Sequence, residues 1–297
     1  MITVKRASEC TFTEALEAWN EGFKGYYVNM EMSLDRYLTR MIKEGLSPEY
    51  SVIAFDENKP VGCILNGIRS INGKNVAWNG GTGVSPDYRN KGVGKLMMEE
   101  TIKVYTEANV QIATLEAISD NQPAIALYEK MGYHIKGQLM NFGQTGEIKF
   151  PALQVTYRSL KCTPKEVGFL SIYNPEVQWQ TQIESIKDGE AIILYDHRDR
   201  EIAYAIYRRT WTEYGEEAGI YLYQCRFQDD LDLNMRYGLL KHVFQSSEAP
   251  KYVVNLPMVD TVLVDILNEL GFSERIGQVS MEKTLELDQA EIPPSGR

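Results

Sequence analysis

Residue types that bind metals are scarce in this sequence of 297 residues. It contains 4 cysteines and 3 histidines, and they are widely scattered. Because they form no Cys-x-x-Cys pair and no other short ligand spacing, we expect no metal site. Isolated cysteines also indicate reduced thiols, and therefore a cytoplasmic location.

Excess positive charge and long apolar runs are absent as well. The chain has 31 Lys and Arg against 41 Asp and Glu, which gives a formal net charge of -10. This balance disfavours nucleic acids as partners and favours small cationic ones. No stretch of about 18 apolar residues occurs, and the first residues contain no apolar signal segment, so we expect no membrane association.

The residues that are present indicate a globular α/β protein. Hydrophobic residues make up 43% of the chain, and its length is roughly twice the commonest domain size. In the first half, predicted strands alternate with helices, which indicates a mixed sheet with at least one parallel pair. The predicted helices are Thr13–Lys24, Leu34–Glu44, Val93–Glu107 and Pro123–Met131, and the predicted strands lie within 50–65, 76–84 and 111–118.

Two pairs of similar segments indicate an internal repeat. A hairpin pattern at residues 50–65 returns at residues 191–206, so that Phe55 corresponds to Tyr195. A helix that ends at Gly132 returns as a helix that ends at Gly271. The two offsets agree within one position, and two separate matches at nearly the same offset predict a duplicated domain.

The boundary between the two copies is expected near Leu160–Gly168, where Pro and Gly interrupt the pattern. We therefore predict a first, catalytic domain at residues 1–160, a second domain at residues 169–286 and a flexible tail at residues 287–297. The stretch from Glu282 to Arg297 contains Pro293 and Pro294 and is expected to fray.

A glycine-containing turn connects the predicted strand at 76–84 to the helix that starts at Val93. Gly92 and Gly94 allow a ligand to approach the unpaired N–H groups of the helix N-terminus, which favour anions. Arg89 and Lys91 add positive charge. A Walker loop would need Gly where Arg89 stands, and a dinucleotide fingerprint would need Gly at Met97, so neither pattern fits. A tight connection without a ligand is the alternative.

The sequence contains two linked motifs, Arg89-Asn-Lys-Gly92-Val-Gly94 and the segment from Asn121 to Tyr133. Together they resemble the signature of the GNAT superfamily of acyl-CoA-dependent N-acyltransferases. The resemblance covers the first half, and the internal repeat extends it to the second. Together they imply two tandem GNAT-like domains, each a mixed, partly splayed sheet flanked by helices, with acetyl-CoA as co-substrate. The implied contacts of the cofactor are Val84, Arg89, Asn90, Lys91, Gly92, Val93, Gly94, Lys95 and Asn121.

Acyl transfer to an amine needs a proton acceptor, a donor to the leaving thiolate and a group that polarises the carbonyl. The resemblance assigns the acid to Tyr128, for which packing in the core is the alternative. It assigns the base to Glu116, twelve residues earlier, unless that carboxylate only faces solvent or a water relay through Asn79 and Thr82 replaces it. The Val84 amide would polarise the carbonyl.

Three further features of the first half bear on the site. Gly80, Gly81 and Gly83 are costly in a strand, which indicates either a bulge or a close approach to the backbone. Asn121 is expected first as a helix N-cap and second as a cofactor contact. The residues proposed for the amine acceptor are Trp19, Glu21, Phe23, Tyr26, Tyr27 and Asn79, although such aromatics more often pack than bind.

The second half is expected to keep the fold and lose the chemistry. At the offset that relates Gly132 to Gly271, the counterparts of Arg89, Gly92, Gly94, Glu116 and Tyr128 are Gln228, Leu231, Leu233, Asn255 and Leu267. We therefore expect a non-catalytic second domain, and a monomer with an internal pseudo-dimer or a weak homodimer. The predicted function is transfer of an acetyl group from acetyl-CoA to a primary amine of a small molecule or peptide. The alternatives are a non-catalytic acyl-CoA-binding regulatory module and an enzyme that uses a longer acyl-CoA.

Overall fold

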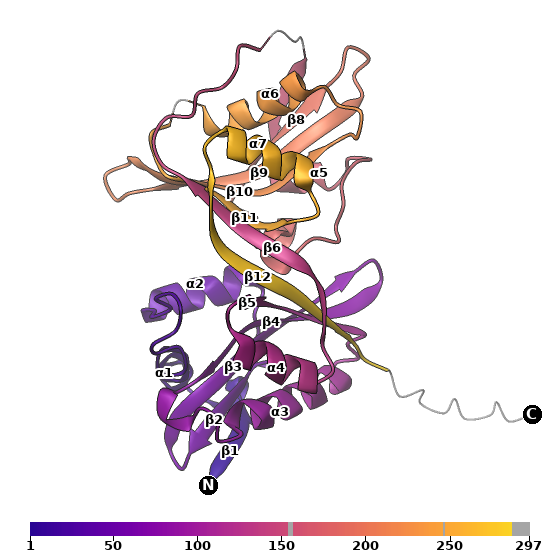
Figure 1. Ribbon diagram of the computed structural model, residues 1–297. Helices are drawn as coiled ribbons and strands as arrows, with labels where there is room; N and C mark the ends of the chain where they lie inside the picture. Colours follow the sequence, from indigo (N-terminus) through magenta and orange to yellow (C-terminus); the bar gives the residue numbers. More distant parts are fainter. Residues whose placement is uncertain (154–156, 246, 287–297) are drawn as a thin grey trace, which may run out of the picture. The chain divides into compact units, whose positions relative to one another are not determined.

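The computed structural model describes residues 1–153, 157–245 and 247–286, and these residues form two compact units (Figure 1). Unit 1 comprises Met1–Ala117, Asn121–Lys136 and the described residues from Met281 to Glu286. Unit 2 comprises Ile118–Asp120 and Gly137–Ser280. The predicted tail at 287–297 lies outside the described residues.

Unit 1 contains a mixed sheet with the strand order β1-β2-β3-β4-β5. All neighbouring pairs are antiparallel except β4 and β5, which are parallel. The sheet is flanked by helices, as predicted from the alternation of apolar patterns. The elements are β1 Ile2–Arg6, α1 Phe12–Gly22, α2 Leu34–Glu44, β2 Val52–Asp56, β3 Lys59–Ile71, β4 Lys74–Val84, α3 Val93–Glu107, β5 Ile112–Ile118 and α4 Gln122–Lys130, with short 3-10 turns η1 Ala7–Glu9 and η2 Pro86–Tyr88.

Local capping explains where the helices of unit 1 begin and end. The Ser33 hydroxyl accepts a hydrogen bond from the N–H of Arg36, and Gly45 ends α2 in the left-handed conformation with φ +65°. The predicted bounds of α2 and α3 are confirmed. Helix α1 ends at Gly22, two residues before the predicted end, and Phe23 then packs against Trp19 with ring centroids 4.1 Å apart.

Helices α1 and α3 cover opposite faces of the sheet in unit 1. A Cβ on Gly83 would point at Phe23 at the end of α1, whereas the side chain of the next residue, Val84, approaches Gly94 in α3. Successive residues of a strand point to opposite faces, so these two contacts assign the two faces. The site described below involves both of them.

Strands β4 and β5 separate halfway along their length. Their pairing runs from Val76 with Ile112 to Asn79 with Leu115 and then stops, although β4 continues to Val84 and β5 to Ile118. Between β3 and β4 the register shifts at this point, because Asn66 pairs with Asn79 while Leu65 pairs with Gly81. Gly80 is therefore the extra residue of a β-bulge. The splayed strands agree with what the family resemblance implies, and the bulge is one of the two explanations offered for the glycines of this strand.

Unit 2 repeats this arrangement of elements around its own sheet. Its strand order is β12-β6-β11-β10-β9-β8-β7, and β10 and β11 form the parallel pair. The predicted division at 160–168 falls on β7 and α5 of this unit. The elements are β6 His134–Gln144, β7 Arg158–Cys162, α5 Pro164–Val167, η3 Trp179–Thr181, η4 Ile183–Ser185, β8 Glu190–Tyr195, β9 Glu201–Trp211, β10 Glu217–Phe227, α6 Leu233–Phe244, β11 Lys251–Pro257, α7 Thr261–Glu269 and β12 Ser273–Thr284.

The predicted repeat is confirmed element by element. The offset that relates Gly132 to Gly271 also relates the first residues of corresponding elements, within one position. The corresponding pairs are α3 and α6, β5 and β11, and α4 and α7. The parallel pair of unit 2 also stops early, at Leu222 with Val253, and β10 has a register shift next to Leu222. The described part of unit 2 has no long helices at the positions of α1 and α2, because α5 and two 3-10 turns precede β8.

Each unit contains a strand segment from the other half of the sequence. In unit 1, the N–H of Leu285 donates to the Gln111 carbonyl over 2.9 Å, and Lys283 Nζ donates to the Met131 carbonyl over 2.8 Å. In unit 2, β6 pairs with β11, with Gln144 opposite Lys251. The expectation that the chain frays from Glu282 is therefore wrong for Glu282–Thr284, which belong to β12.

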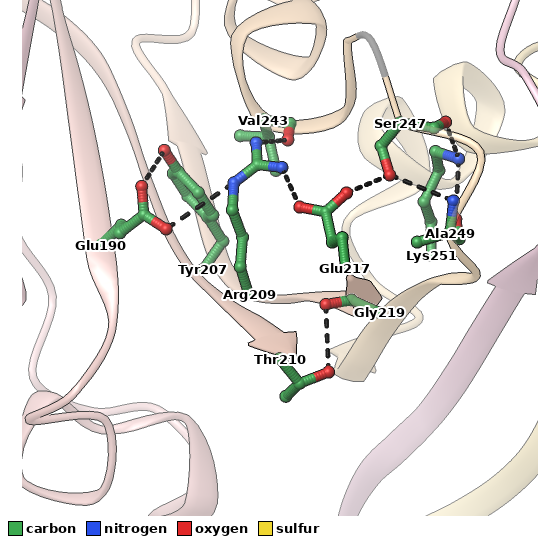
Figure 2. A network of polar contacts seen from close by, with 10 residues as sticks. All are labelled: Glu190, Tyr207, Arg209, Thr210, Glu217, Gly219, Val243, Ser247, Ala249 and Lys251. Carbon is green, nitrogen blue, oxygen red and sulfur yellow. Dashed lines mark hydrogen bonds and ion pairs between the residues drawn. The ribbon is translucent and has the colours of Figure 1, made fainter. Parts of the chain in front are cut away.

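A buried polar network stabilises the end of the sheet in unit 2 (Figure 2). The fully buried Lys251 donates from Nζ to the carbonyls of Gly146, Ser247 and Ala249 over 2.7, 2.7 and 2.9 Å. Arg209 forms an ion pair with Glu217 and donates to the Val243 carbonyl over 2.8 Å. Burial lowers the pKa of Lys251, and the three carbonyls satisfy its ammonium group.

Candidate active site

The turn before α3 presents free backbone donors. Gly92 is the N-cap with φ +83°, and Asn90 also has a left-handed backbone with φ +59°. The first helical hydrogen bond runs from the N–H of Leu96 to the Gly92 carbonyl over 3.0 Å. Among the described residues, none accepts a hydrogen bond from the N–H groups of Val93, Gly94 or Lys95. A helix N-terminus in this state favours an anion.

The two glycines of this turn have different structural roles. A Cβ on Gly92 would meet nothing within 4 Å, so its left-handed backbone alone favours glycine. A Cβ on Gly94 would lie 3.2 Å from the Leu127 side chain of α4 and 3.7 Å from that of Val84. Gly94 therefore also permits close packing of α3 against α4.

The cationic residues of the turn are partly engaged by the protein itself. Arg89 donates from Nε to the Val84 carbonyl over 2.9 Å and from Nη2 to the Lys24 carbonyl over 2.7 Å. Lys91 Nζ lies 5.7 Å from the centroid of the Tyr88 ring, and Lys95 forms an ion pair with Glu99 over 3.3 Å. The guanidinium of Arg89 thus links the end of β4 to the loop after α1, a role that the sequence did not predict.

Tyr128 of α4 belongs to a polar cluster at the end of β4. Its side chain is 6% exposed, and the hydroxyl of Thr82 is close enough to its phenol to lower the pKa of that phenol. Asn79 Nδ2 donates to that hydroxyl over 2.9 Å, and Asn79 Oδ1 accepts from the N–H of Gly81 over 3.0 Å. Burial raises the pKa of Tyr128 to about 12, so the phenol keeps its proton at neutral pH.

Glu116 is a partly buried residue of β5, the strand that pairs with β4. Its Oε2 accepts a hydrogen bond from Trp78 Nε1 over 2.7 Å. The pKa of its carboxyl is raised to about 7, mainly by burial and to a smaller extent by the nearby Glu44 carboxylate, and the Trp78 hydrogen bond opposes both effects. A carboxyl with a pKa near neutrality suits a proton acceptor.

Glu116 and Tyr128 lie toward opposite faces of the sheet. Trp78, which holds Glu116, precedes Asn79 in β4, and Asn79 contacts Met98 of α3 and the Thr82 hydroxyl that meets Tyr128. Because neighbouring strand residues alternate, Trp78 and Asn79 point to different faces. One reaction can use both groups only where the sheet is open, and β4 and β5 separate at this position.

The glycines of β4 are explained by the packing of aromatic rings, which belong to α1 and its C-cap at Gly81 and Gly83 and to β4 itself at Gly80. A Cβ on Gly81 would lie 2.9 Å from ring atoms of Trp19, and a Cβ on Gly83 would lie 2.9 Å from ring atoms of Phe23. A Cβ on Gly80 would lie 2.5 Å from the Trp78 ring. These glycines thus accommodate aromatic rings of the protein, and the close approach that we predicted for a ligand is made by α1.

The residues proposed for the acceptor divide into packing residues and pocket residues. Trp19 is fully buried and donates from Nε1 to the Met30 carbonyl over 2.8 Å, so it packs and holds the loop. The loop after α1 encloses a hollow of about 450 Å³. Tyr27 is 55% exposed beside Tyr26. The residues that line the hollow are Asn20, Glu21, Phe23, Lys24, Gly25, Tyr26, Val28, Asn29, Met30 and Glu31.

Tyr26 connects this loop to the N-terminus of α4. Its phenol shares a hydrogen bond with the Asn121 side chain, and burial raises its pKa. Asn121 Oδ1 also accepts from the N–H of Ala124 over 3.4 Å, which confirms the predicted N-cap. The structure therefore brings Tyr26 and Asn121 together, and Tyr26 is close enough to Tyr128 to influence its ionisation.

Sequence reasoning missed Arg40 and Glu44 of α2. Arg40 Nη2 donates to the Gly80 carbonyl over 2.6 Å, and Arg40 Nε forms an ion pair with Glu44 over 2.9 Å. Their four-residue spacing within a predicted helix is a signal for the ion pair alone. Their contact with β4 depends on the tertiary structure.

The corresponding positions of unit 2 lack these features. Asp232 is the N-cap of α6, and its own carboxylate accepts from the N–H of Asn234 over 2.8 Å. Leu267, the counterpart of Tyr128, is fully buried. No group of His, Cys, Asp or Glu suited to a metal ion occurs within the described ranges of either unit, and none of the helices described is long and apolar enough to span a membrane.

Comparison with known proteins points to one family. Residues 13–133 match the model described as "Acetyltransferase (GNAT) family". No curated protein matches the sequence at a significant level.

Many solved structures share the fold. A structure described as a tandem GNAT protein from the clavulanic acid biosynthesis pathway has a TM-score of 0.63 and 11% identity, covering 96% of this chain and 98% of that one. A GCN5-related N-acetyltransferase from Sphaerobacter thermophilus has a TM-score of 0.66 and 12% identity, covering 96% and 95%.

A third structure contains the fold as part of a longer chain. It is the GCN5-related glucosamine N-acetyltransferase region of a fungal multi-domain GH3 β-N-acetylglucosaminidase, with a TM-score of 0.71 and 16% identity. The match covers 95% of this chain and 38% of that one, so this protein spans well under half of that relative's length. At such identities these likenesses show the fold alone.

Proposed function

Because the first half of the chain carries a domain of the GNAT acetyltransferase family, we propose that the protein transfers an acetyl group from acetyl-CoA to a primary amine of a small molecule or peptide. Acyl transfer is the chemistry of the family. What we propose beyond this is that acetyl-CoA is the donor and a primary amine is the acceptor.

One observation carries the proposal: a gap in the sheet lies between a buried phenol and a carboxyl whose pKa is about 7. The free N–H groups at the start of α3 suit a diphosphate, and the exposed edge of β4 beyond Asn79 suits an extended chain that pairs with it. The residues present therefore fit an acyl-CoA.

Each residue of the site has one role in the proposed reaction. Glu116, as carboxylate, accepts a proton from the amine of the acceptor, directly or through water. The neutral amine nitrogen that results forms a bond to the thioester carbon and releases its second proton to water, and the Val84 N–H stabilises the negative charge on the carbonyl oxygen. Tyr128 donates its proton to the sulfur as the carbon–sulfur bond breaks, and the products are an acetylated amine and CoA thiol.

The acceptor is proposed to enter from the α1 and α2 face of the sheet, on which Glu116 lies. Glu21 and Glu31 beside the hollow of the α1 loop suit a cationic amine. A structural neighbour is described as acting on glucosamine, so amino sugars belong among the acceptors to test.

Release of free CoA thiol from acetyl-CoA tests the proposal. Polyamines, amino acids, aminoglycosides, glucosamine and short peptides are supplied in turn, and longer acyl-CoAs are compared as donors. We expect acceptor-dependent thiol release that Tyr128→Phe reduces. Tight acetyl-CoA binding without release for any acceptor or donor would contradict transfer and support a non-catalytic acyl-CoA-binding module.

A further inference from the structure

Helix α2 contacts the candidate site through a pair of charged residues that the proposed reaction does not use. Arg40 is 14% exposed at its side chain, and its guanidinium lies 4.5 Å from the Trp19 ring centroid. Its Nη1 is buried and has no hydrogen-bond partner within the described residues. A buried cation with an unsatisfied donor is costly, so its position needs an explanation.

The other two nitrogens of Arg40 connect α2 to the bulge of β4. Nη2 donates to the carbonyl of Gly80, the extra residue of the bulge, over 2.6 Å. Nε donates to Glu44 Oε2 over 2.9 Å. One planar guanidinium thus fixes the bulge and the last turn of α2 at the same time, a geometry that a lysine cannot reproduce.

The bulge in turn holds the residue that binds Glu116. The Cα of Gly80 lies against the Trp78 ring so closely that a Cβ there would lie 2.5 Å from it. The Trp78 indole donates to Glu116 over 2.7 Å. A continuous chain of contacts therefore runs from Arg40 through Gly80 and Trp78 to the carboxyl of Glu116.

We propose that Arg40 and Glu44 are positioning residues for the proposed acyl transfer: Arg40 fixes the bulge of β4, whose Gly80 packs on the Trp78 ring that donates to Glu116, and Glu44, held by Arg40, adjusts the charge state of Glu116. This inference rests on the proposed role of Glu116 as base. The Glu44 carboxylate opposes ionisation of Glu116, and Arg40 limits this effect by pairing with Glu44.

Other charged and titratable groups also face this pair: Arg40 lies near the Tyr37 phenol and the Cys63 thiol, and burial raises the pKa of both groups. Arg69 of β3 donates from Nη2 to the main-chain carbonyl of Glu44 over 3.0 Å. Strand β4 contributes the neutral indole of Trp78, and α1 contributes the neutral ring of Trp19. Within unit 1, Glu44 is the charged side chain identified as disfavouring the Glu116 carboxylate.

The test measures the ionisation of Glu116 without using activity. The indole N–H resonance of Trp78, identified by its loss in Trp78→Phe, is followed by NMR as a function of pH, because its hydrogen-bond acceptor is Glu116. We expect a midpoint near the value of about 7 in the unaltered protein. Glu44→Gln should lower this midpoint, and Arg40→Gln should raise it, each by roughly 0.5–1 pH unit.

Two further variants separate charge from structure. Arg40→Lys keeps a positive charge beside Glu44, so its midpoint should stay near that of the unaltered protein while the bulge loses its hydrogen bond. Glu100→Gln removes a carboxylate from a similar helical ion pair, with Lys103 of α3 over 2.9 Å, and should leave the midpoint unchanged.

The outcomes distinguish the inference from the proposed function. The inference is overturned if Glu44→Gln leaves the midpoint within 0.1 pH unit (about 0.1 kcal/mol) of the unaltered protein. If the midpoints move as expected but no acceptor releases thiol, the inference stands as a property of Glu116 and the proposed function fails. In an active enzyme, the pH at which kcat/KM rises should move with the NMR midpoint in each variant.

Discussion

Two groups at the candidate site, the partly buried Glu116 and the buried Tyr128, are ionisable side chains whose environments favour their neutral forms. Each therefore reduces the stability of the fold if it ionises inside it. That effect can be measured without knowing the acceptor.

Replacement of Glu116 by Gln should remove a pH dependence of stability. The pKa of this carboxyl is raised from 4.5 to about 7 in the folded protein, so folding is favoured below pH 4.5 and this contribution is lost as pH rises through 7. Gln keeps an acceptor for Trp78 but cannot ionise. The free energy of unfolding of Glu116→Gln minus that of the unaltered protein should therefore be larger at pH 8 than at pH 4.5. The increase should be up to roughly 3 kcal/mol.

Urea unfolding of both proteins at the two pH values measures this difference. If the two proteins differ in free energy of unfolding by the same amount at both pH values, Glu116 has an ordinary pKa. The proposal that it acts as a base with a pKa near 7 would then be contradicted. For activity, the unaltered enzyme should gain kcat/KM as pH rises through about 7, and the variant should lack this rise.

Replacement of Tyr128 by Phe should affect turnover and not cofactor binding. The ring packing remains, but the proton donor beside Thr82 is lost, so turnover should fall by roughly ten- to a thousandfold while the affinity for acetyl-CoA stays the same. Steady-state kinetics and calorimetry measure the two quantities. Full activity in the variant would show that Tyr128 only packs in the hydrophobic core and is not the proton donor.

Tyr133→Phe is a matched control for this change. Tyr133 is also buried, and its hydroxyl has no hydrogen-bond partner in the part of the chain that the structure describes. Removal of an unsatisfied hydroxyl should leave turnover unchanged and stability equal or higher.

At the level of helices and strands, the sequence predicted those features that neighbouring residues in the chain determine, such as helix ends and caps. The bounds of α2 and α3 and the N-cap at Asn121 were predicted because serine, asparagine and glycine caps act on their own helix. The splay of β4 and β5 followed from the family resemblance. The roles of Arg40 and Arg89 were not predictable, because both side chains bind carbonyls of distant segments.

The three glycines of β4 also show that contacts with distant segments could not be predicted from the sequence. Their position predicted a close approach, but only the structure identifies α1 as the element that approaches Gly81 and Gly83, and the Trp78 ring as the group that approaches Gly80. Gly81→Ala should lower the free energy of unfolding by about 1–3 kcal/mol, because the new Cβ overlaps the Trp19 ring.

Gly137→Ala in β6 is the control, since its Cβ would lie 3.7 Å from Ser280 Oγ, an ordinary contact. Denaturant unfolding of both variants measures the comparison. A Gly81→Ala protein as stable as the control would show that α1 packs less closely on β4 than described.

For the whole molecule, the exchange of strand segments between units was the main feature that the sequence could not predict. Segments β6 and β12 occupy equivalent positions in the two repeats, because His134 and Ser273 are related by the same offset as Gly132 and Gly271. Either segment therefore suits either place by its pattern, and the sequence does not distinguish the two pairings.

The exchange predicts that the first half does not fold stably alone. A fragment of residues 1–150 lacks Met281–Leu285, which belong to unit 1 and bond to Met131 and Gln111. We expect it to show reduced soluble yield and a broad thermal transition by circular dichroism, and coexpression with residues 151–297 to restore both. A cooperative transition of the isolated fragment at the temperature of the full chain would contradict this prediction.

The central claim is that unit 1 binds acetyl-CoA through the turn before α3, whereas unit 2 has lost that site. Isothermal titration of the full chain with acetyl-CoA tests it, using Gly92→Val and a matched variant. Gly73→Val introduces the same side chain at a similar backbone angle, φ +76°, in the β3–β4 turn, and a Cβ there meets nothing within 4 Å. Both variants incur a similar strain of roughly 1–2 kcal/mol.

We expect one acetyl-CoA per chain in the unaltered protein and in Gly73→Val, and no binding in a folded Gly92→Val protein. A stoichiometry near two would show that unit 2 retains a site. Unchanged affinity in Gly92→Val would show that the turn before α3 does not hold the diphosphate.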